Sequence, residues 1–180
     1  FLRFKMKIIS PIPHDLILAC SGGVDSMAVL HFLLNSRRNV SLIHINHSTP
    51  MANVYQYCVS TVAKMYDIKL DVYKIQGNNE NEWREKRYEI FENCSKNVIT
   101  CHHYDDNLET QVMRKQFIPH KRGNIIRPFL NVKKQELIDY AIYHNLHWVE
   151  DPTNHDSEYC ERNRIREAIL RMRESCVIVD

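Results

Sequence analysis

The sequence has few glycines and no closely paired cysteines, and both features narrow what the protein can be. Only four of the 180 residues are glycine, and Gly22 and Gly23 are adjacent. The six cysteines contain no Cys-x-x-Cys pair and do not cluster, which argues against a zinc site and against a small disulfide-bonded scaffold. We therefore expect reduced thiols in an intracellular protein.

The sequence also lacks long hydrophobic runs and a strong net charge. No stretch approaches a membrane span, and residues 1–7 are too short and too charged for a complete signal peptide. We expect a cytoplasmic protein with no membrane partner, or an organelle matrix protein if an upstream transit peptide is missing. A formal net charge of +2 argues against a globally basic nucleic-acid binder. The length favours a single catalytic domain over 1–180.

Short apolar runs alternate with segments of helical periodicity. The run at 16–20 is continuous, which is typical of a strand buried on both faces, and a helix is predicted at 27–34. This alternation continues and predicts a parallel, doubly wound α/β sheet. The further predicted strands are 40–45, 68–75 and 97–101, and the further helices lie near 54–65 and 80–94 and directly after 101.

Unusual residues follow three of the predicted strands. They occupy 21–26, 44–47 and 102–109. In parallel sheets, ligands bind beyond the carboxyl ends of the strands. We therefore expect the three segments to converge on one site.

The first of these segments has the properties of a phosphate-binding loop. Adjacent glycines allow close approach of a ligand, and the following helix start offers N–H groups, to which Ser21 and Ser26 add hydroxyls. An ordinary strand-to-helix turn with a serine cap is the alternative. Asp25 would repel a nucleotide unless a cation lay between them, which predicts Mg²⁺ there, with simple helix capping as the alternative.

The full string, Ser21-Gly22-Gly23-Val24-Asp25-Ser26, resembles the loop of the PP-loop ATP pyrophosphatases. These enzymes cleave ATP between the α- and β-phosphates and transfer AMP. The string lacks the Lys-Ser/Thr ending of the kinase-type loop. The resemblance implies an adenine nucleotide alpha hydrolase-like fold that binds ATP and Mg²⁺. The implied nucleotide-binding residues are Ser21, Gly22, Gly23, Val24, Asp25 and Ser26, together with Ala19, His44 and Asn46 near the adenine.

The segment His102-His103-Tyr104-Asp105-Asp106-Asn107-Leu108-Glu109-Thr110 gathers three carboxylates at a helix start. Such a group can bind Mg²⁺ or a cationic substrate, and acids that stabilise a helix N-terminus are the alternative. The string resembles the His-His-x-Asp-Asp-Gln-x-Glu-Thr motif of tRNA(Ile)-lysidine synthetases, with Asn107 in place of Gln. The resemblance implies lysine binding by Asp106 and Glu109, a metal contact at Asp105 and a catalytic role for His102.

A basic tract follows, with no Asp or Glu between 111 and 135. A solvated surface is the ordinary explanation of a charge run, but beside a nucleotide loop it also predicts a path for an RNA backbone. Arg114, Lys115 and Arg127 are the RNA candidates. The glycine-rich stretch that lysidine synthetases carry here is absent from 114–123.

Two more segments extend the resemblance to 16–171. Arg84 belongs to a Glu-x-x-x-Arg-x-x-Arg-Tyr helix, which an amphipathic helix with paired charges also explains. Asn154 follows an Asp-Pro turn, and Arg162 and Arg166 lie on a basic helix expected at about 160–174. The resemblance implies RNA contacts for the last three. Fuller members carry C-terminal tRNA-binding domains, so the chain is expected to be a compact form or a fragment.

The resemblance implies an ATP-dependent ligase that adenylates the C2 carbonyl oxygen of the wobble cytidine of tRNA-Ile with a CAU anticodon, releasing pyrophosphate. L-lysine then displaces AMP to give lysidine. Two alternatives remain open at this point: a tRNA thiolase of the same superfamily, and an inactive nucleotide- or RNA-binding module. The oligomeric state is open, with a homodimer as one option. The implied catalytic residues are Asp25, Arg84, His102, Asp106 and Glu109.

Overall fold

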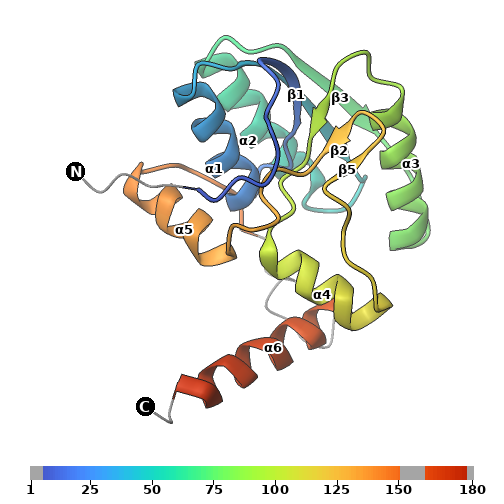
Figure 1. Cartoon of the computed structure of the whole chain (residues 1–180). Helices are drawn as coiled ribbons and strands as arrows, with labels where there is room; N and C mark the ends of the chain where they lie inside the picture. Colours follow the sequence, from blue (N-terminus) through green and yellow to red (C-terminus); the bar gives the residue numbers. More distant parts are fainter. Residues whose placement is uncertain (1–5, 151–160, 178–180) are drawn as a thin grey trace.

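A six-stranded sheet forms the centre of the computed structural model, which describes residues 6–150 and 161–177 (Figure 1). Its strand order is β3-β2-β1-β4-β6-β5, and all neighbouring pairs are parallel except β5 with β6. The strands are β1 (Asp15–Ala19), β2 (Asn39–Asn46), β3 (Leu70–Lys74), β4 (Val98–Ile99), β5 (Lys121–Arg122) and β6 (Ile125–Ile126).

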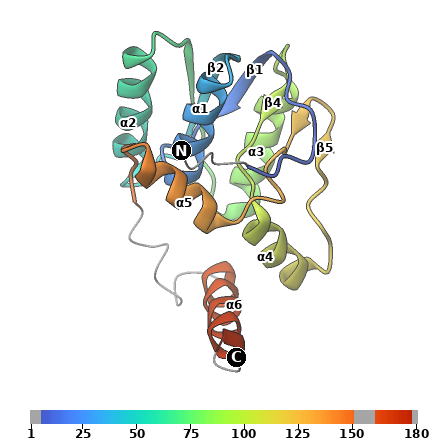
Figure 2. The ribbon, with the colours of Figure 1, turned by 60° about the vertical axis from the view of Figure 1, so that its left-hand side comes forward.

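Helices cover both faces of this sheet. Residues of α1, α2 and α5 form one buried cluster with the sheet, and residues of α3 form a second cluster on the opposite face (Figures 1 and 2). The predicted doubly wound α/β architecture is therefore confirmed. The helices are α1 (Val24–Asn35), α2 (Ala52–Met65), α3 (Glu80–Glu92), α4 (Tyr104–Arg114), α5 (Lys134–Tyr143) and α6 (Glu161–Val177).

The first strand shows how sequence produces the two-sided core. Alternate residues of a strand point to opposite faces. Leu16 and Leu18 pack in the cluster that contains α1 and α2, whereas Ile17 and Ala19 pack against the cluster that contains α3. A continuous apolar run is what a strand covered on both faces needs, as predicted.

Two elements go beyond the sequence prediction. The segment interpreted only as a basic tract contains the β5–β6 hairpin, whose turn has Gly123 at φ +57°, and the start of α5. The fourth predicted strand, 97–101, is reduced to β4, although Thr100 still donates to the carbonyl of Ile126 at 3.1 Å. A two-residue strand and a two-residue hairpin arm are too short to show a period in sequence.

Two helices lie beyond the carboxyl ends of the strands. Helix α4 begins directly after β4, and α6 packs against α4 at the lower edge of the molecule in Figures 1 and 2. The predicted basic helix at 160–174 is present as α6. Among the described residues, no helix is long and apolar enough to cross a membrane.

Candidate active site

Gly22 fixes the shape of the loop between β1 and α1. Its φ is +92°, a conformation that side chains disfavour. A Cβ atom at this position would also lie 3.2 Å from the carbonyl oxygen of Tyr55 and 3.3 Å from Cγ2 of Val59. The loop therefore requires glycine for its conformation and for the close approach of α2.

The hydroxyl of Ser26 holds this loop from inside. Ser26 is 1% exposed; its Oγ accepts from the N–H of Gly22 at 3.0 Å and donates to the carbonyl of Gly23 at 2.9 Å. Gly23 is the N-cap of α1, and no side chain caps this helix. The loop is thus preformed, and the first-turn N–H groups of α1 are suited to an anion.

The carboxylate of Asp25, in the first turn of α1, already holds a cation. Both of its oxygens lie 2.7 Å from Nζ of Lys134, and Oδ2 lies 3.8 Å from Nε2 of His103. The backbone N–H of Lys134 donates to Oδ2 of Asp105 at 2.7 Å. The start of α5 is therefore fixed against both the phosphate loop and the acidic start of α4.

His103 lies among three carboxylates. Its ring nitrogens are 3.8 Å from Asp25, 3.7 Å from Asp105 and 3.5 Å from Asp106. His103 is also the N-cap of α4: the N–H of Asp106 donates to its Nδ1 at 3.4 Å, and its own N–H donates to Oδ2 of Asp106 at 3.0 Å. This reciprocal cap orients the acidic residues toward the loop.

The environment of Asp106 favours its charged form. Burial raises the pKa of this carboxyl, but His103, His102, the backbone N–H of His103 and Arg162 together outweigh burial and hold the pKa below its ordinary value. Asp106 is therefore an anion at neutral pH.

Glu109 is buried and paired with α6. It is 1% exposed, its Oε1 accepts from Nε of Arg166 at 2.7 Å, and its Oε2 lies 3.7 Å from Nε of Arg162. The three residues were predicted separately, Glu109 for lysine and the arginines for RNA. The structure brings them together in one ion cluster.

The imidazole of His102 lies close to Asp106 and Thr100. Its Nδ1 is 2.8 Å from the hydroxyl of Thr100, and burial lowers its pKa to about 4, with Arg127, Arg87 and Arg162 acting in the same direction and Asp106 against it. The imidazole is therefore neutral at physiological pH. A neutral ring serves as a hydrogen-bonding group and is too weak a base to deprotonate an ammonium.

Arg127 requires a correction. It is 2% exposed, and its guanidinium donates to the carbonyl of Pro119 at 2.7 Å and to the hydroxyl of Tyr88 at 3.0 Å. The structure thus gives Arg127 an internal role that leaves it no surface for an RNA backbone. The guanidiniums of Arg84 and Arg122 also lie over the ring of Tyr88, at 5.1 and 4.6 Å from its centroid.

A second group of buried polar atoms comes from the carboxyl-terminal part of β2, the loop that follows it and α3. Nε2 of His44, Nδ1 of His47 and Nε1 of Trp83 are buried and have no hydrogen-bond partner among the described residues. The rings of His47 and Trp83 are 5.6 Å apart, and burial, Arg87 and His44 lower the pKa of His47 to about 4. Buried polar nitrogens without partners are rare and point to a ligand or water.

The remaining predicted residues differ in what they can contact. Asn46 is 1% exposed, and its amide holds Gln56 at 2.7 Å and the N–H of Ser48 at 2.8 Å, so it shapes the loop. Arg114 and Lys115 are exposed at the end of α4. Asn154 lies outside the described residues.

Lys134, His103 and Trp83 lie in the site but were not assigned to it from sequence. In the sequence, Lys134 is one of several cations of the basic tract. The sequence gives a weak indication for His103, because it follows the predicted site residue His102. It gives a similar indication for Trp83, which precedes Arg84 on the same helix. For Lys134 no sequence signal existed, since its partner Asp25 is 109 residues away.

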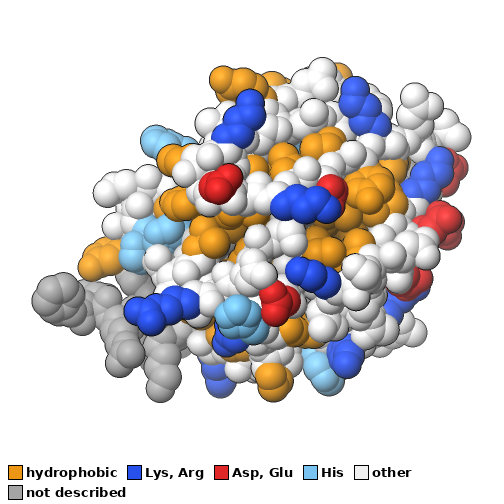
Figure 3. Space-filling model, turned by 90° about the horizontal axis from the view of Figure 1, so that it is seen from above, with side chains coloured by type: hydrophobic (Ala, Val, Ile, Leu, Met, Phe, Trp, Pro, Cys, Tyr) orange, Lys and Arg blue, Asp and Glu red, His pale blue; other side chains and the backbone are white. Residues whose placement is uncertain are grey.

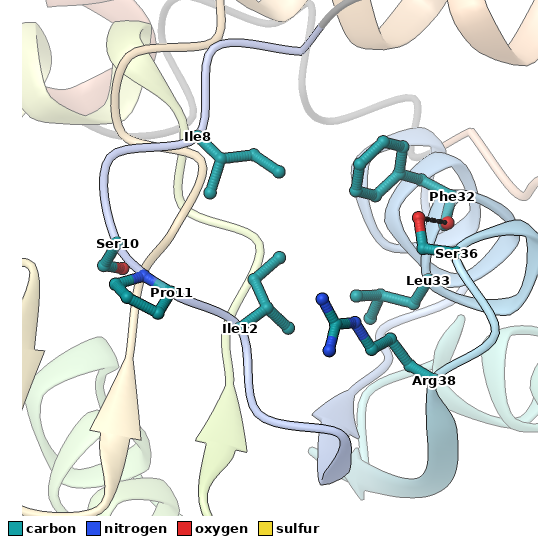
Figure 4. Close-up of a pocket in the computed structure, with 8 residues that line it drawn as sticks. All are labelled: Ile8, Ser10, Pro11, Ile12, Phe32, Leu33, Ser36 and Arg38. Carbon is teal, nitrogen blue, oxygen red and sulfur yellow. Dashed lines mark hydrogen bonds between the residues drawn. The ribbon is translucent and has the colours of Figure 1, made fainter.

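A cavity of about 240 Å³ lies elsewhere (Figure 4). Its lining includes Phe32, Leu33 and Ser36, at the carboxyl end of α1. A 12-residue helix is about 18 Å long, so this cavity lies far from the phosphate loop at the other end of α1. Acidic and basic side chains are interspersed on the side of the molecule opposite α4 and α6 (Figure 3). Neither feature matches a nucleotide or RNA site.

No group of three or more His, Cys, Asp or Glu side chains in the described part of the chain forms a ready-made metal site. A metal ion at Asp25 would need further oxygen ligands from a bound molecule, as Mg²⁺ usually takes from nucleotide phosphates.

The sequence matches the family described as PP-loop domain over residues 3–173. The chain belongs to the PP-loop domain family. This finding agrees with the preformed loop 21–26 and with its place at the carboxyl end of β1.

Curated relatives of this PP-loop domain include tRNA(Ile)-lysidine synthases. That of Actinobacillus pleuropneumoniae is 31% identical, over 94% of this chain and 45% of the relative. That of Staphylococcus aureus is 31% identical, over 88% and 44%. The bifunctional protein TilS/HprT of Listeria monocytogenes is 36% identical, over 86% and 29%. The chain spans less than half the length of these relatives.

Solved structures share the fold of this PP-loop domain. The U34-tRNA thiolase NcsA from Methanococcus maripaludis superimposes with a TM-score of 0.60 at 16% identity, over 98% of this chain and 75% of that one. The NH3-dependent NAD synthetase from Campylobacter jejuni gives a TM-score of 0.52 at 17% identity, over 94% and 80%. The predicted nucleotide hydrolase-like fold is confirmed.

Proposed function

We propose that this PP-loop domain is the catalytic part of a tRNA(Ile)-lysidine synthase. The C2 carbonyl oxygen of the wobble cytidine in tRNA-Ile with a CAU anticodon attacks the α-phosphate of ATP and releases pyrophosphate. The ε-amine of L-lysine then displaces AMP at C2. The observation that carries the proposal is the junction of the phosphate loop with the acidic start of α4: His103 lies within 3.8 Å of Asp25 and 3.5 Å of Asp106. One site thus has groups for ATP and for a cationic amino acid.

In the first step, the preformed loop and the first turn of α1 bind the phosphates of ATP. Asp25 fits a metal ligand because its carboxylate is only partly exposed and already holds a cation, the ammonium of Lys134. Mg²⁺ bound there would neutralise phosphate charge. Asp105 is the less suited ligand, since one of its oxygens accepts from the backbone of Lys134.

In the second step, Asp106 and Glu109 attract the positively charged amino group of lysine. Both are deeply placed and flanked by cations, so lysine competes with Arg162 and Arg166 for Glu109. Neutral His102 hydrogen-bonds the reacting base and is not the general base, because its pKa of about 4 is too low.

The unpartnered nitrogens of His44, His47 and Trp83 supply base recognition. Adenine and cytosine both present donors and acceptors on their edges and a flat face that stacks on aromatic rings. The tilted pair His47–Trp83 offers such a surface. Arg84 follows Trp83 on α3, and its guanidinium lies over the ring of Tyr88. Of the predicted RNA contacts, the exposed Arg114 and Lys115 at the end of α4 remain available to a phosphate backbone, whereas Arg162 is paired with Glu109.

Two of the four described cysteines, the buried Cys20 and the half-buried Cys101, are poorly suited to the thiolase alternative. Burial raises the pKa of Cys20 to about 11 and that of Cys101 well above its ordinary value. Both thiols are therefore protonated at neutral pH, whereas sulfur transfer and cluster ligation need thiolates.

The test is to incubate the protein with ATP, Mg²⁺, isotope-labelled lysine and a CAU-anticodon tRNA, and to examine the digested nucleosides by mass spectrometry. Labelled lysidine is the expected product. A thiolated base, or ATP binding with no pyrophosphate released, would point instead to the thiolase or to an inactive binding module. The same tRNA with its wobble cytidine replaced by uridine is the matched control.

A further inference from the structure

Lys134 is the only described lysine that an ion pair joins to the phosphate loop. Its Nζ lies 2.7 Å from both oxygens of Asp25, in the first turn of α1. The side chains of Lys134 and Asp25 are 38% and 27% exposed, so the pair faces the open side of the site. An ammonium is thus held beside the N–H groups that the proposed function assigns to phosphate.

The backbone of Lys134 is fixed by a hydrogen bond, whereas among the described residues its ammonium is held only by the partly exposed ion pair with Asp25. Its N–H donates to Asp105, and it is the first residue of α5, whose N-cap Lys133 donates its backbone N–H to Oε2 of Glu136 at 2.9 Å. The lysine stem carries rotatable bonds between this anchor and the charge. A partly exposed ion pair exchanges partners at small cost.

We propose that Lys134 is a phosphate-binding residue that exchanges partners when nucleotide enters. In the free protein it neutralises Asp25, which otherwise would repel a polyanion. When ATP binds and a divalent cation takes Asp25, the ammonium turns to the phosphate chain. This inference rests on the proposed function, because it presumes that ATP occupies the loop at 21–26.

The competing explanation is that Lys134 only neutralises Asp25 and never touches phosphate. The two explanations differ once the carboxylate is removed. If neutralisation were its whole role, loss of Lys134 would have no effect in an Asp25→Asn background. If Lys134 contacts phosphate, its loss weakens nucleotide binding in that background as well.

The experiment measures ATP binding by calorimetry in EDTA, so that no metal contributes, for the wild type, Asp25→Asn, Lys134→Gln and the double variant. Asp25→Asn is expected to bind ATP more tightly than the wild type, because repulsion is gone and Lys134 is free. The double variant is expected to bind about tenfold more weakly than Asp25→Asn, the size of one lost charge contact. Adenosine binding should be the same in both.

Controls separate this contact from general charge and folding effects. Lys64→Gln removes an exposed lysine from the last turn of α2 and should leave ATP binding unchanged. Lys134→Met, which keeps the aliphatic stem, replaces the glutamine variant if circular dichroism shows misfolding. Equal ATP affinity of Asp25→Asn and the double variant overturns the inference. A wild type that binds no ATP even with Mg²⁺ overturns the proposed function itself.

Discussion

Arg166 on α6 and Glu109 on α4 form a two-point ion pair across 57 residues of sequence. Nε of Arg166 donates to Oε1 at 2.7 Å, and Nη2 donates to Oε2 at 3.3 Å. The side chain of Glu109 is only 2% exposed, so its charge requires a partner inside the protein. This contact joins the C-terminal helix to the acidic cluster of the site.

Replacing Arg166 with Met should destabilise the protein by about 2 kcal/mol, because the buried carboxylate of Glu109 then keeps only its more distant contact with Arg162. The expected loss is smaller than for a fully buried ion pair, since the side chain of Arg166 is 35% exposed. Urea unfolding measures the change. Arg171→Met, which removes the exposed i,i+4 pair with Glu167 on the same helix, should cost less than about 0.5 kcal/mol. Equal losses in the two variants would contradict a special role for Glu109.

Removing the carboxylate of Glu109 should separate the two chemical steps. Glu109→Gln keeps the size of the side chain and leaves the phosphate loop intact, so tRNA-dependent release of pyrophosphate should continue. Lysine incorporation should fall by about 100-fold, the order expected for loss of a charged substrate contact. Asp25→Asn should instead abolish pyrophosphate release in the presence of Mg²⁺. A Glu109→Gln variant that loses both steps equally would argue against lysine binding there.

Stability should fall as the pH drops from about 6.5 to about 4. His102 and His47 have pKa values of about 4 in the folded protein against 6.5 when unfolded, so the unfolded chain binds more protons in this window. The contribution of His102 is on the order of 2 to 3 kcal/mol, and that of the more accessible His47 is smaller. Asp106, whose folded pKa is lowered, adds to the loss at still lower pH.

Urea unfolding at pH 7 and pH 4.5 checks this expectation. His102→Asn keeps a hydrogen-bonding group beside Thr100 but cannot titrate, so the difference in unfolding free energy between the two pH values should shrink. If the unfolding free energy of the His102 variant changed between pH 7 and pH 4.5 as much as that of the wild type, folding would not lower the pKa of His102.

Sequence predicted the sheet and the phosphate loop because both depend on local pattern. The run 16–20 is apolar at every position, and the φ of Gly22 strongly favours glycine. The partners of charged residues were not predictable in this way. A basic tract does not distinguish Arg127, buried against Tyr88, from the exposed Arg114, and only the folded chain places Lys134 on Asp25. The sequence shows which residues are charged, but tertiary packing determines which groups these residues contact.

Gly22 and Gly123 allow the space requirement of the phosphate loop to be measured apart from its backbone conformation. Both have positive φ, at +92° and +57°, but an added Cβ would crowd Tyr55 and Val59 at Gly22 and would meet nothing within 4 Å at Gly123. Gly123→Ala should cost about 1 kcal/mol, the price of the left-handed conformation alone. Gly22→Ala should cost about 3 kcal/mol in urea unfolding and weaken ATP binding, because α2 or the loop must move. Similar losses of unfolding free energy at the two positions would mean that the loop can shift to accommodate a Cβ atom. Close packing against α2 would then not determine the shape of the loop.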